Sequence, residues 1–191
     1  MLPQQKTCNE AAAEMANKKS IVIFTGPNIN NLDEIPDAQD PEGLFGIMDL
    51  KDKYGGETNP REILTNTFFK KQPNFLWKYI YDSKSFAEKA KPTKAHKAIL
   101  KFLEFAAKRD DIKANVITQN CDNLMERLIS KSKILQDSQD DFLLTKEKSL
   151  NDHLYYPFLT QVHGTERLMH CSDPECDYHE QLEPVPNLMD I

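Results

Sequence analysis

Glycine is scarce in this chain, and long apolar runs are missing. Only 6 of the 191 residues are glycine. Folds that bind nucleotides use glycines in the turns that hold phosphate, so few positions can serve that purpose here. The most apolar stretch, Ile21 to Phe24, is far too short to span a membrane, and the N-terminus has no apolar signal-peptide core. We therefore expect an intracellular protein, nuclear or cytoplasmic, that has no membrane association.

Cysteine is also rare, and surplus positive charge is absent. The 4 cysteines do not form the dense framework of a disulfide-stabilised secreted domain. Of these, Cys171 and Cys176 lie close together and indicate half of a metal site in a reducing compartment. The net charge of -6 argues against nucleic-acid binding, because neutralising phosphates needs surplus Lys and Arg. The length suits one domain, or one domain with a small module.

Three short segments rich in β-branched and aromatic residues predict the strands of a sheet. They run from Ser20 to Gly26, from Ala114 to Gln119 and from Tyr156 to Val162. Helices are expected at 9–17, 60–70, 74–89, from Thr93 onward and at 122–129. Strands that alternate with helices imply a parallel α/β sheet, and ligands of such sheets bind beyond the carboxyl ends of the strands. Polar residues after the three strands should therefore gather at one edge.

Two of the expected helices have clear amino-terminal signals. Thr93 can cap the helix that follows it, whose apolar face should be formed by Ala95, Ile99, Phe102, Leu103 and Ala106. Asp122 is well placed to cap the helix at 122–129. Beyond that helix, residues 130–152 are polar and aperiodic and predict a loop or insertion. The prolines after residue 168 suggest a loop-built module and a tail.

Several short segments follow one another in a specific order. They are Ile21 to Gly26, Ile35-Pro36-Asp37, Gly43-Leu44-Phe45, Lys91-Pro92-Thr93 with His96, Thr118 to Asp122, His163-Gly164-Thr165, and the pair Cys171 and Cys176. In this order they resemble the sirtuin family of NAD-dependent protein lysine deacylases. The match spans roughly residues 20 to 176.

The resemblance implies a fold and a division of the chain. The fold is α/β, with a partial Rossmann-like parallel sheet flanked by helices and a small module of helical or zinc-binding type. Residues 1–19 would be an N-terminal extension. Residues 20–167 would be an incomplete NAD-binding catalytic domain with a polar insertion at about 130–155, and residues 168–191 a partial zinc module and tail.

The resemblance also implies a reaction and a set of site residues. A sirtuin transfers the acyl group of an acylated lysine in a protein substrate to the ADP-ribose of NAD and releases nicotinamide. His163 would be the general base, although by residue type alone it could be a strand-end histidine satisfied by the backbone. The residues implied as cofactor contacts are Gly26, Asp37, Gln119, Asn120 and Asp122. An amide and a carboxylate suit the nicotinamide and its ribose, but Asn120 could also be a loop residue and Asp122 only a helix cap.

A metal site is the second implication. Cys171 and Cys176 have four residues between them, which is within the spacing of a zinc hairpin. Tetrahedral zinc needs four ligands, and the second cysteine pair of the family is absent from this sequence. His170 and His179 could complete a mixed site, or the two thiols could hold no metal. We expect His96 to be structural and Cys121 to be a packing residue.

The sequence departs from the family pattern in three places. The Gly-Ala-Gly-x-Ser loop reads Gly26-Pro27-Asn28-Ile29-Asn30, and the Asp-Phe-Arg segment reads Asp37-Ala38-Gln39. These changes remove a glycine, a backbone N–H and a positive charge from the cofactor loop. The family also continues through further strands beyond the first cysteine pair.

We therefore expect little or no deacylase activity from these 191 residues. An open sheet edge should lower stability or favour association with another chain. The alternatives are a non-catalytic interaction protein on the same scaffold, or a fragment of a longer active sirtuin.

Overall fold

The computed structural model describes residues 7–30, Ile35, 64–137, 158–166, 168–173, 175–176 and 178–181. Its helices are α1 (Cys8–Met15), the 3-10 helix η1 (Pro27–Ile29), α5 (Asn66–Lys71), α6 (Pro73–Lys89), α7 (Lys94–Ala107), α8 (Leu124–Ile129) and α9 (Lys133–Asp137). Its strands are β1 (Ser20–Thr25), β2 (Lys113–Thr118), β3 (Leu159–Gln161), β4 (Leu168–His170) and β5 (His179–Gln181). Within the described ranges, no helix combines the length and apolar character needed to cross a membrane.

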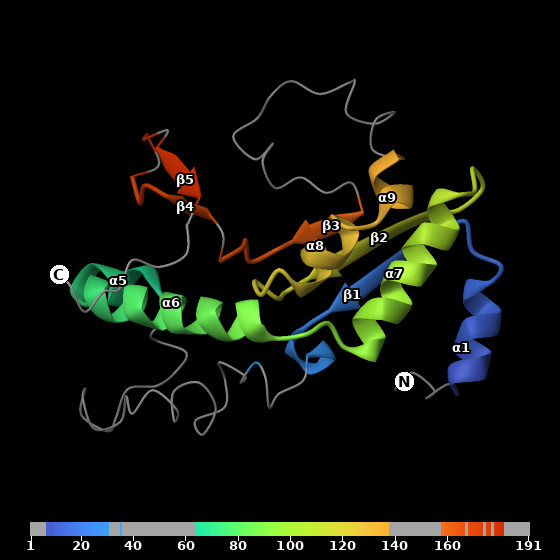
Figure 1. The fold of residues 1–191 in the computed structure, drawn as a ribbon, viewed down its shortest axis with the longest axis horizontal. Helices are drawn as coiled ribbons and strands as arrows, with labels where there is room; N and C mark the ends of the chain where they lie inside the picture. Colours follow the sequence, from blue (N-terminus) through green and yellow to red (C-terminus); the bar gives the residue numbers. More distant parts are fainter. Residues whose placement is uncertain are drawn as a thin grey trace, which may run out of the picture.

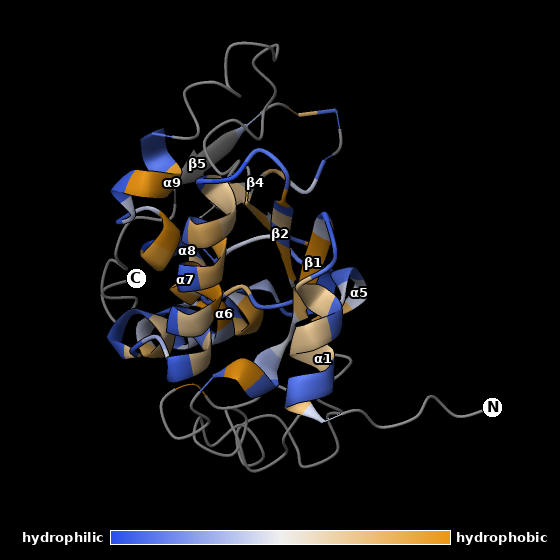
Figure 2. Ribbon diagram, turned by 90° about the vertical axis from the view of Figure 1, so that its right-hand side faces the viewer, coloured by the Kyte–Doolittle hydropathy of each residue, from blue (hydrophilic) through white to orange (hydrophobic). Residues whose placement is uncertain are grey.

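A parallel sheet of β1, β2 and β3, in that order, forms the centre of the molecule. In its register Ile23 lies opposite Val116, and Val116 lies opposite Leu159. Figure 1 shows the three strands side by side, and Figure 2 places α7, α8 and α9 together on one side of β1 and β2. The predicted α/β architecture with a parallel sheet is confirmed. The third strand is shorter than predicted, and Tyr156 lies outside the described residues.

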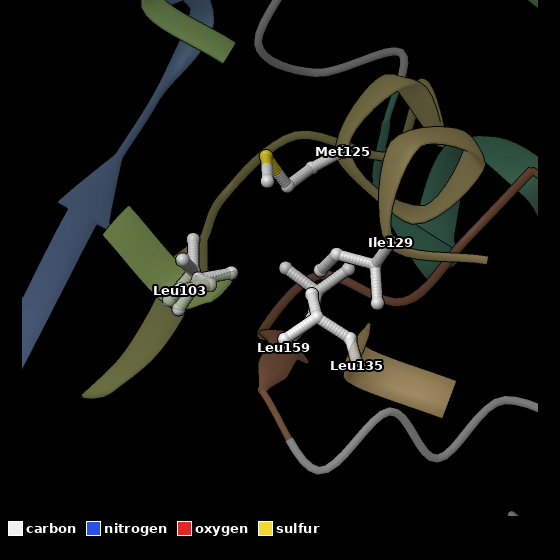
Figure 3. Close-up of a cluster of buried hydrophobic side chains, with 6 residues drawn as sticks. Leu103, Met125, Ile129, Leu135 and Leu159 are labelled. Atoms are coloured by element: carbon white, nitrogen blue, oxygen red, sulfur yellow. The ribbon is translucent and has the colours of Figure 1, made fainter. Parts of the chain in front are cut away.

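The side of the sheet that α7 to α9 cover holds the main core. The apolar cluster consists of Leu103, Val116, Met125, Ile129, Leu135 and Leu159, all of them no more than 6% exposed. Figure 3 shows the labelled side chains of this cluster converging from α7, α8, α9 and β3. Burial of each such side chain contributes roughly 1.5–3 kcal/mol. This packing holds β2 and β3 against the three helices.

Strand β1 presents apolar side chains to solvent as well. Val22 is 58% exposed and Phe24 is 62% exposed, whereas Ile21 on the alternate face is buried. The alternation follows from the two-residue period of a strand. The exposed pair lies on one face of β1 and does not test the expected open sheet edge, so association with another chain stays a prediction.

The helices largely follow their sequence signals. Thr7 and Thr93 form capping boxes at α1 and α7, with Glu10 and His96 as their partners. The predicted helix at 74–89 is confirmed as α6, which begins at Pro73, where the missing N–H costs nothing. Of the predicted helix at 60–70, residues 60–63 lie outside the described residues, and the described helix α5 begins later than predicted, at Asn66.

Three local predictions were wrong. Ala95 is exposed, and His96 is buried in its place on the inner face of α7. The polar stretch after residue 130 contains helix α9, anchored by the fully buried Leu135, while residues 138–152 lie outside the described residues. The segment after residue 168 contains the antiparallel pair β4 and β5 in place of a loop-built module. Strands of three residues are too short to show a period in the sequence.

Candidate functional site

The loops after the three parallel strands meet at one edge of the sheet. Beyond the last paired residues, the Gln119 N–H donates to the carbonyl of Thr25 over 3.0 Å, and the Val162 N–H donates to the carbonyl of Thr118 over 3.0 Å. These bonds extend the strand pairing into the loops. They place Gly26, Gln119 and His163 beside one another, as the parallel topology predicts.

Gly26 lies close to the Gln119 side chain and has ordinary dihedral angles. Its φ of -147° is ordinary extended backbone. A Cβ at this position would lie 3.2 Å from Oε1 of Gln119, which is tighter than most such contacts. The glycine therefore lets the end of β1 lie against the Gln119 side chain.

His163 is exposed, and one of its ring nitrogens is fixed by the backbone. Nδ1 lies 3.0 Å from the carbonyl oxygen of Gln119. A carbonyl oxygen can only accept, so Nδ1 must carry the hydrogen of this bond. Nε2 of the neutral ring then keeps a lone pair. Such an imidazole can accept a proton from a group in front of it.

Asn30, Asn120 and Asp122 form a bridged polar group that joins the loops after β1 and β2. Nδ2 of Asn30 donates to Oδ2 of Asp122 over 2.7 Å, and Nδ2 of Asn120 donates to Oδ1 of Asn30 over 3.4 Å. The Asn120 N–H donates to the hydroxyl of Thr118, which holds the loop against the strand. Within the described part of the chain, the buried Oδ1 of Asn120 has no hydrogen-bond partner. A buried acceptor of this kind calls for a donor from a ligand or from water.

The start of α8 fixes Asp122 and ties it to the loop after β3. Oδ1 of Asp122 accepts from the Leu124 N–H over 2.9 Å, so the predicted capping contact exists, although the helix cap position itself is Asn123. Asn123 has a φ of 59°, a left-handed conformation that asparagine tolerates well. Its Oδ1 accepts from Gln161 and from Thr165. Sequence analysis did not single out Asn123, whose only signal was an asparagine directly before a helix.

His96 lies at the base of this site. It is 2% exposed, and its Nδ1 accepts from the Thr93 N–H over 3.2 Å, while the Thr93 hydroxyl donates to the carbonyl of Ile29. Burial lowers the pKa of His96, and the nearby Asp122 carboxylate opposes this shift. Together with Thr25, Thr118, Asn120 and other residues, His96 lines a small cavity of about 10 Å³, room for about one water molecule. The predicted structural role agrees with these contacts, but a position lining the cavity was not foreseen.

A polar cluster of Ser83, Cys121 and Glu166 lies beneath the His163 loop. The Ser83 hydroxyl donates to Oε1 of Glu166 over 2.5 Å, and the Glu166 N–H donates to the carbonyl of Cys121. Sγ of Cys121 is 3.6 Å from the carbonyl oxygen of His163. Burial raises the pKa of Glu166 to about 7 and that of Cys121 to about 11. The thiol therefore stays neutral, as expected for a packing residue.

Three predicted site residues remain, Asp37, Cys171 and Cys176. Asp37 lies outside the described residues. Cys171 and Cys176 lie on the connection between β4 and β5, where the Cys171 N–H donates to the carbonyl of Tyr178 and the Cys176 N–H to that of Asp173. Among the residues whose side chains the structure describes, no three or more His, Cys, Asp or Glu side chains gather closely enough to hold a metal ion. The described residues thus supply at most two of the four ligands that zinc needs.

Known proteins resemble the chain in sequence. No family model matches it. It is 31% identical over 136 residues to an NAD-dependent protein deacylase of Helicobacter pylori, covering 70% of this chain and 51% of that protein. It is 27% identical over 182 residues to an NAD-dependent protein deacylase of Thermococcus sibiricus, covering 95% of this chain and 54% of that protein. The chain spans about half the length of the curated relatives it matches.

Solved structures resemble it in fold. A Sir2 homologue in complex with NAD matches with a TM-score of 0.59 and 22% identity, over 95% of this chain and 54% of the other. A mutant Sir2 homologue in complex with 2'-O-acetyl ADP ribose matches with a TM-score of 0.62 and 21% identity, over 95% of this chain and 55% of the other. At this level of identity the likeness establishes the fold.

Proposed function

The chain belongs to the sirtuin family, and on that premise we propose that its strand-end loops form the nicotinamide–ribose end of an NAD-dependent protein deacylase site. The observation that supports this most directly is the bond between Nδ1 of His163 and the carbonyl of Gln119. It joins the loops after β2 and β3 and leaves Nε2 of His163 to act on a ligand. The loop after β2, whose Gln119 carbonyl holds His163, also carries the donor and acceptor groups of Asn120 and Asp122.

The polar groups of the site suit the nicotinamide riboside half of NAD. Oδ1 of Asn120 is a buried acceptor that a ribose hydroxyl or an amide could satisfy. Asp122 is a carboxylate fixed by the N–H of Leu124. Gly26 and Gln119 would line the same part of the cofactor site, and Asp37 stays a predicted cofactor contact. The cavity of about 10 Å³ must widen for such a ligand to enter.

In the proposed reaction, NAD would supply an activated ribose carbon, which the acyl oxygen of an acylated lysine of a protein substrate would attack as nicotinamide leaves. The residues of this chain would accept and release the protons of this reaction. Nε2 of His163 would accept a proton from a ribose hydroxyl, and the carbonyl of Gln119 would stabilise the Nδ1–H of the resulting imidazolium. His163 is exposed, so it can return the proton to solvent.

Nicotinamide release from NAD in the presence of an acetyl-lysine peptide tests this role of His163. We expect turnover by the purified chain to be low, because the cofactor loop has lost a glycine and a positive charge. Whatever turnover exists should fall by about 10²-fold or more in His163→Ala, as for loss of a general base. Val162→Ala, a change at the exposed neighbour, should leave it unchanged.

A calorimetric titration with NAD separates this proposal from its alternative. Measurable affinity supports the cofactor site even where turnover is too slow to detect. Absence of both NAD binding and nicotinamide release would refute the proposal, and would favour a non-catalytic interaction protein that kept the scaffold.

We also propose that Cys171 and Cys176 contribute two thiolates to a zinc site. The supporting features are their spacing and the short β4–β5 pair, in which the backbones of His170 and His179 lie opposite each other. No step of the reaction depends on this metal. Elemental analysis of the purified chain should find about one zinc per chain and a loss of zinc in Cys176→Ser. A metal-free chain would refute the proposal.

A further inference from the structure

The side chain of Asn30 is held at both ends of its carboxamide. Its NH₂ group donates to Oδ2 of Asp122 over 2.7 Å, and its oxygen accepts from Nδ2 of Asn120 over 3.4 Å. The first of these bonds has a charged acceptor and is short, which places it in the stronger class of hydrogen bonds. Asn30 comes from the loop after β1, 90 or more residues from both partners. The bridge is therefore a product of the fold and not of local sequence.

Asn120 and Asp122 thus bind a primary carboxamide. The oxygen of such a group needs a donor, which Asn120 supplies, and its NH₂ needs an acceptor, which Asp122 supplies. Oδ1 of Asp122 is engaged by the Leu124 N–H, so Oδ2 is the oxygen that faces Asn30. Nicotinamide is also a primary carboxamide. The same pair of groups would recognise it by the same chemistry.

We propose that Asn30 is an internal occupant of a carboxamide subsite formed by Asn120 and Asp122, and that it competes with nicotinamide and with the nicotinamide end of NAD. This rests on the proposed function, and it adds a self-inhibiting residue to that site. Asn120 and Asp122 both line the small cavity at this edge of the sheet, so the group that binds Asn30 also faces the cavity.

Asn30 can leave this place without disturbing the loop. Its backbone N–H donates to the carbonyl of Pro27, and the neighbouring carbonyl of Ile29 accepts from the hydroxyl of Thr93. The loop backbone is therefore tied down independently of the Asn30 side chain. Rotation of one side chain breaks the bond to Asp122. A hydrogen bond to a charged group corresponds to roughly a ten- to hundredfold factor in an equilibrium constant, and competition of that size should be measurable.

Calorimetric titration of nicotinamide into three forms of the full chain tests the proposal. The forms are the natural sequence, Asn30→Ala, and Asn74→Ala as a matched change at an exposed asparagine of α6. We expect Asn30→Ala to bind nicotinamide about tenfold more tightly or better, and Asn74→Ala to match the natural chain. Asn30→Ser serves as a second variant if Asn30→Ala fails to fold. Nicotinic acid should gain nothing from either change, because its carboxylate is repelled by Asp122.

Each other outcome of this titration would overturn the proposed competition by Asn30. Equal, measurable affinities for nicotinamide in the natural chain and Asn30→Ala would overturn the competition and leave the proposed function standing. Tighter binding by the natural chain would make Asn30 a ligand contact and overturn its role as a competitor. Binding of nicotinamide by none of the forms would overturn this inference, and the NAD titration described above would then decide whether the proposed function stands.

Discussion

The apolar cluster under α7 to α9 and the polar cluster of Ser83, Cys121 and Glu166 are built on opposite principles. The apolar cluster contains no titratable side chain, and its central members Leu103, Ile129 and Leu135 are 0% exposed. The polar cluster buries a carboxyl group whose pKa rises to about 7. Within the described residues, Oε2 of Glu166 has no hydrogen-bond partner. The apolar cluster therefore stabilises the fold, whereas the polar cluster contains a buried carboxyl group whose ionisation costs free energy.

The location of the two clusters explains the difference. The apolar cluster packs against the central residues of β2 and β3, where complete burial favours apolar side chains. The polar cluster lies under the loop that carries His163, at the carboxyl ends of the same strands. Departures from ideal packing gather at functional sites because those sites must present polar groups. The left-handed Asn123 and the bridged Asn30 lie at this end as well.

Leu103→Ala should show the largest effect and sharpen this contrast. The side chain is fully buried between α7 and its neighbours, so truncation leaves a cavity and should lower the free energy of unfolding by about 2–5 kcal/mol. The loss should be the same at pH 5 and pH 8, because no member of the apolar cluster titrates. Urea denaturation of the natural chain and the variant at pH 5 and at pH 8 measures this change in the free energy of unfolding.

Leu64→Ala provides the matched control, since that leucine is 55% exposed. Its expected cost is within about 0.5 kcal/mol. Similar costs for the two leucines would show that the apolar cluster does not dominate stability, and a strongly pH-dependent cost at Leu103 would break the contrast between the clusters.

Most of the fold could be predicted from the sequence because it depends on local signals. Strands β1 and β2 are short apolar runs, and Thr93 marks the start of α7 by its capping chemistry. Residues that follow parallel strands must share an edge, which is why Gln119 and His163 were expected to meet. The short elements α9 and β4 lack a period long enough to detect, and they were missed.

The remainder of the site depends on contacts that no local pattern encodes. Asn30 meets Asp122 across 92 positions, and Ser83 meets Glu166 across 83. A surface loop with polar residues gives no sign of either pairing. Ala95 was expected on the apolar face of α7 and is exposed, whereas the imidazole of His96 lines the cavity at the strand ends. Residue type alone could not show whether Ala95 or His96 is the buried residue, because the residues that surround the imidazole are distant in the sequence.

Glu166→Gln should have a smaller, pH-dependent effect. Burial is the main cause of the raised pKa of Glu166, the charges of Asp122 and Glu88 add to it, and the Ser83 hydroxyl and Lys84 oppose it. Between about pH 4.5, the ordinary value, and about pH 7, the folded protein holds a proton that the unfolded chain has released. The free energy of unfolding of the natural chain should therefore fall across this window and stay level above it.

Gln at position 166 is always neutral and can still accept from the Ser83 hydroxyl, so the variant should lack this loss. At pH 5 the two proteins should be nearly equal, and at pH 8 Glu166→Gln should be more stable by up to about 3 kcal/mol. Urea denaturation at both pH values measures the difference, with Glu14→Gln on the exposed helix α1 as the control. Stability curves that run parallel from pH 5 to pH 8 would mean that the carboxyl of Glu166 ionises without penalty. The polar cluster would then be no more costly than the apolar one, and the contrast between the two regions would lose its energetic basis.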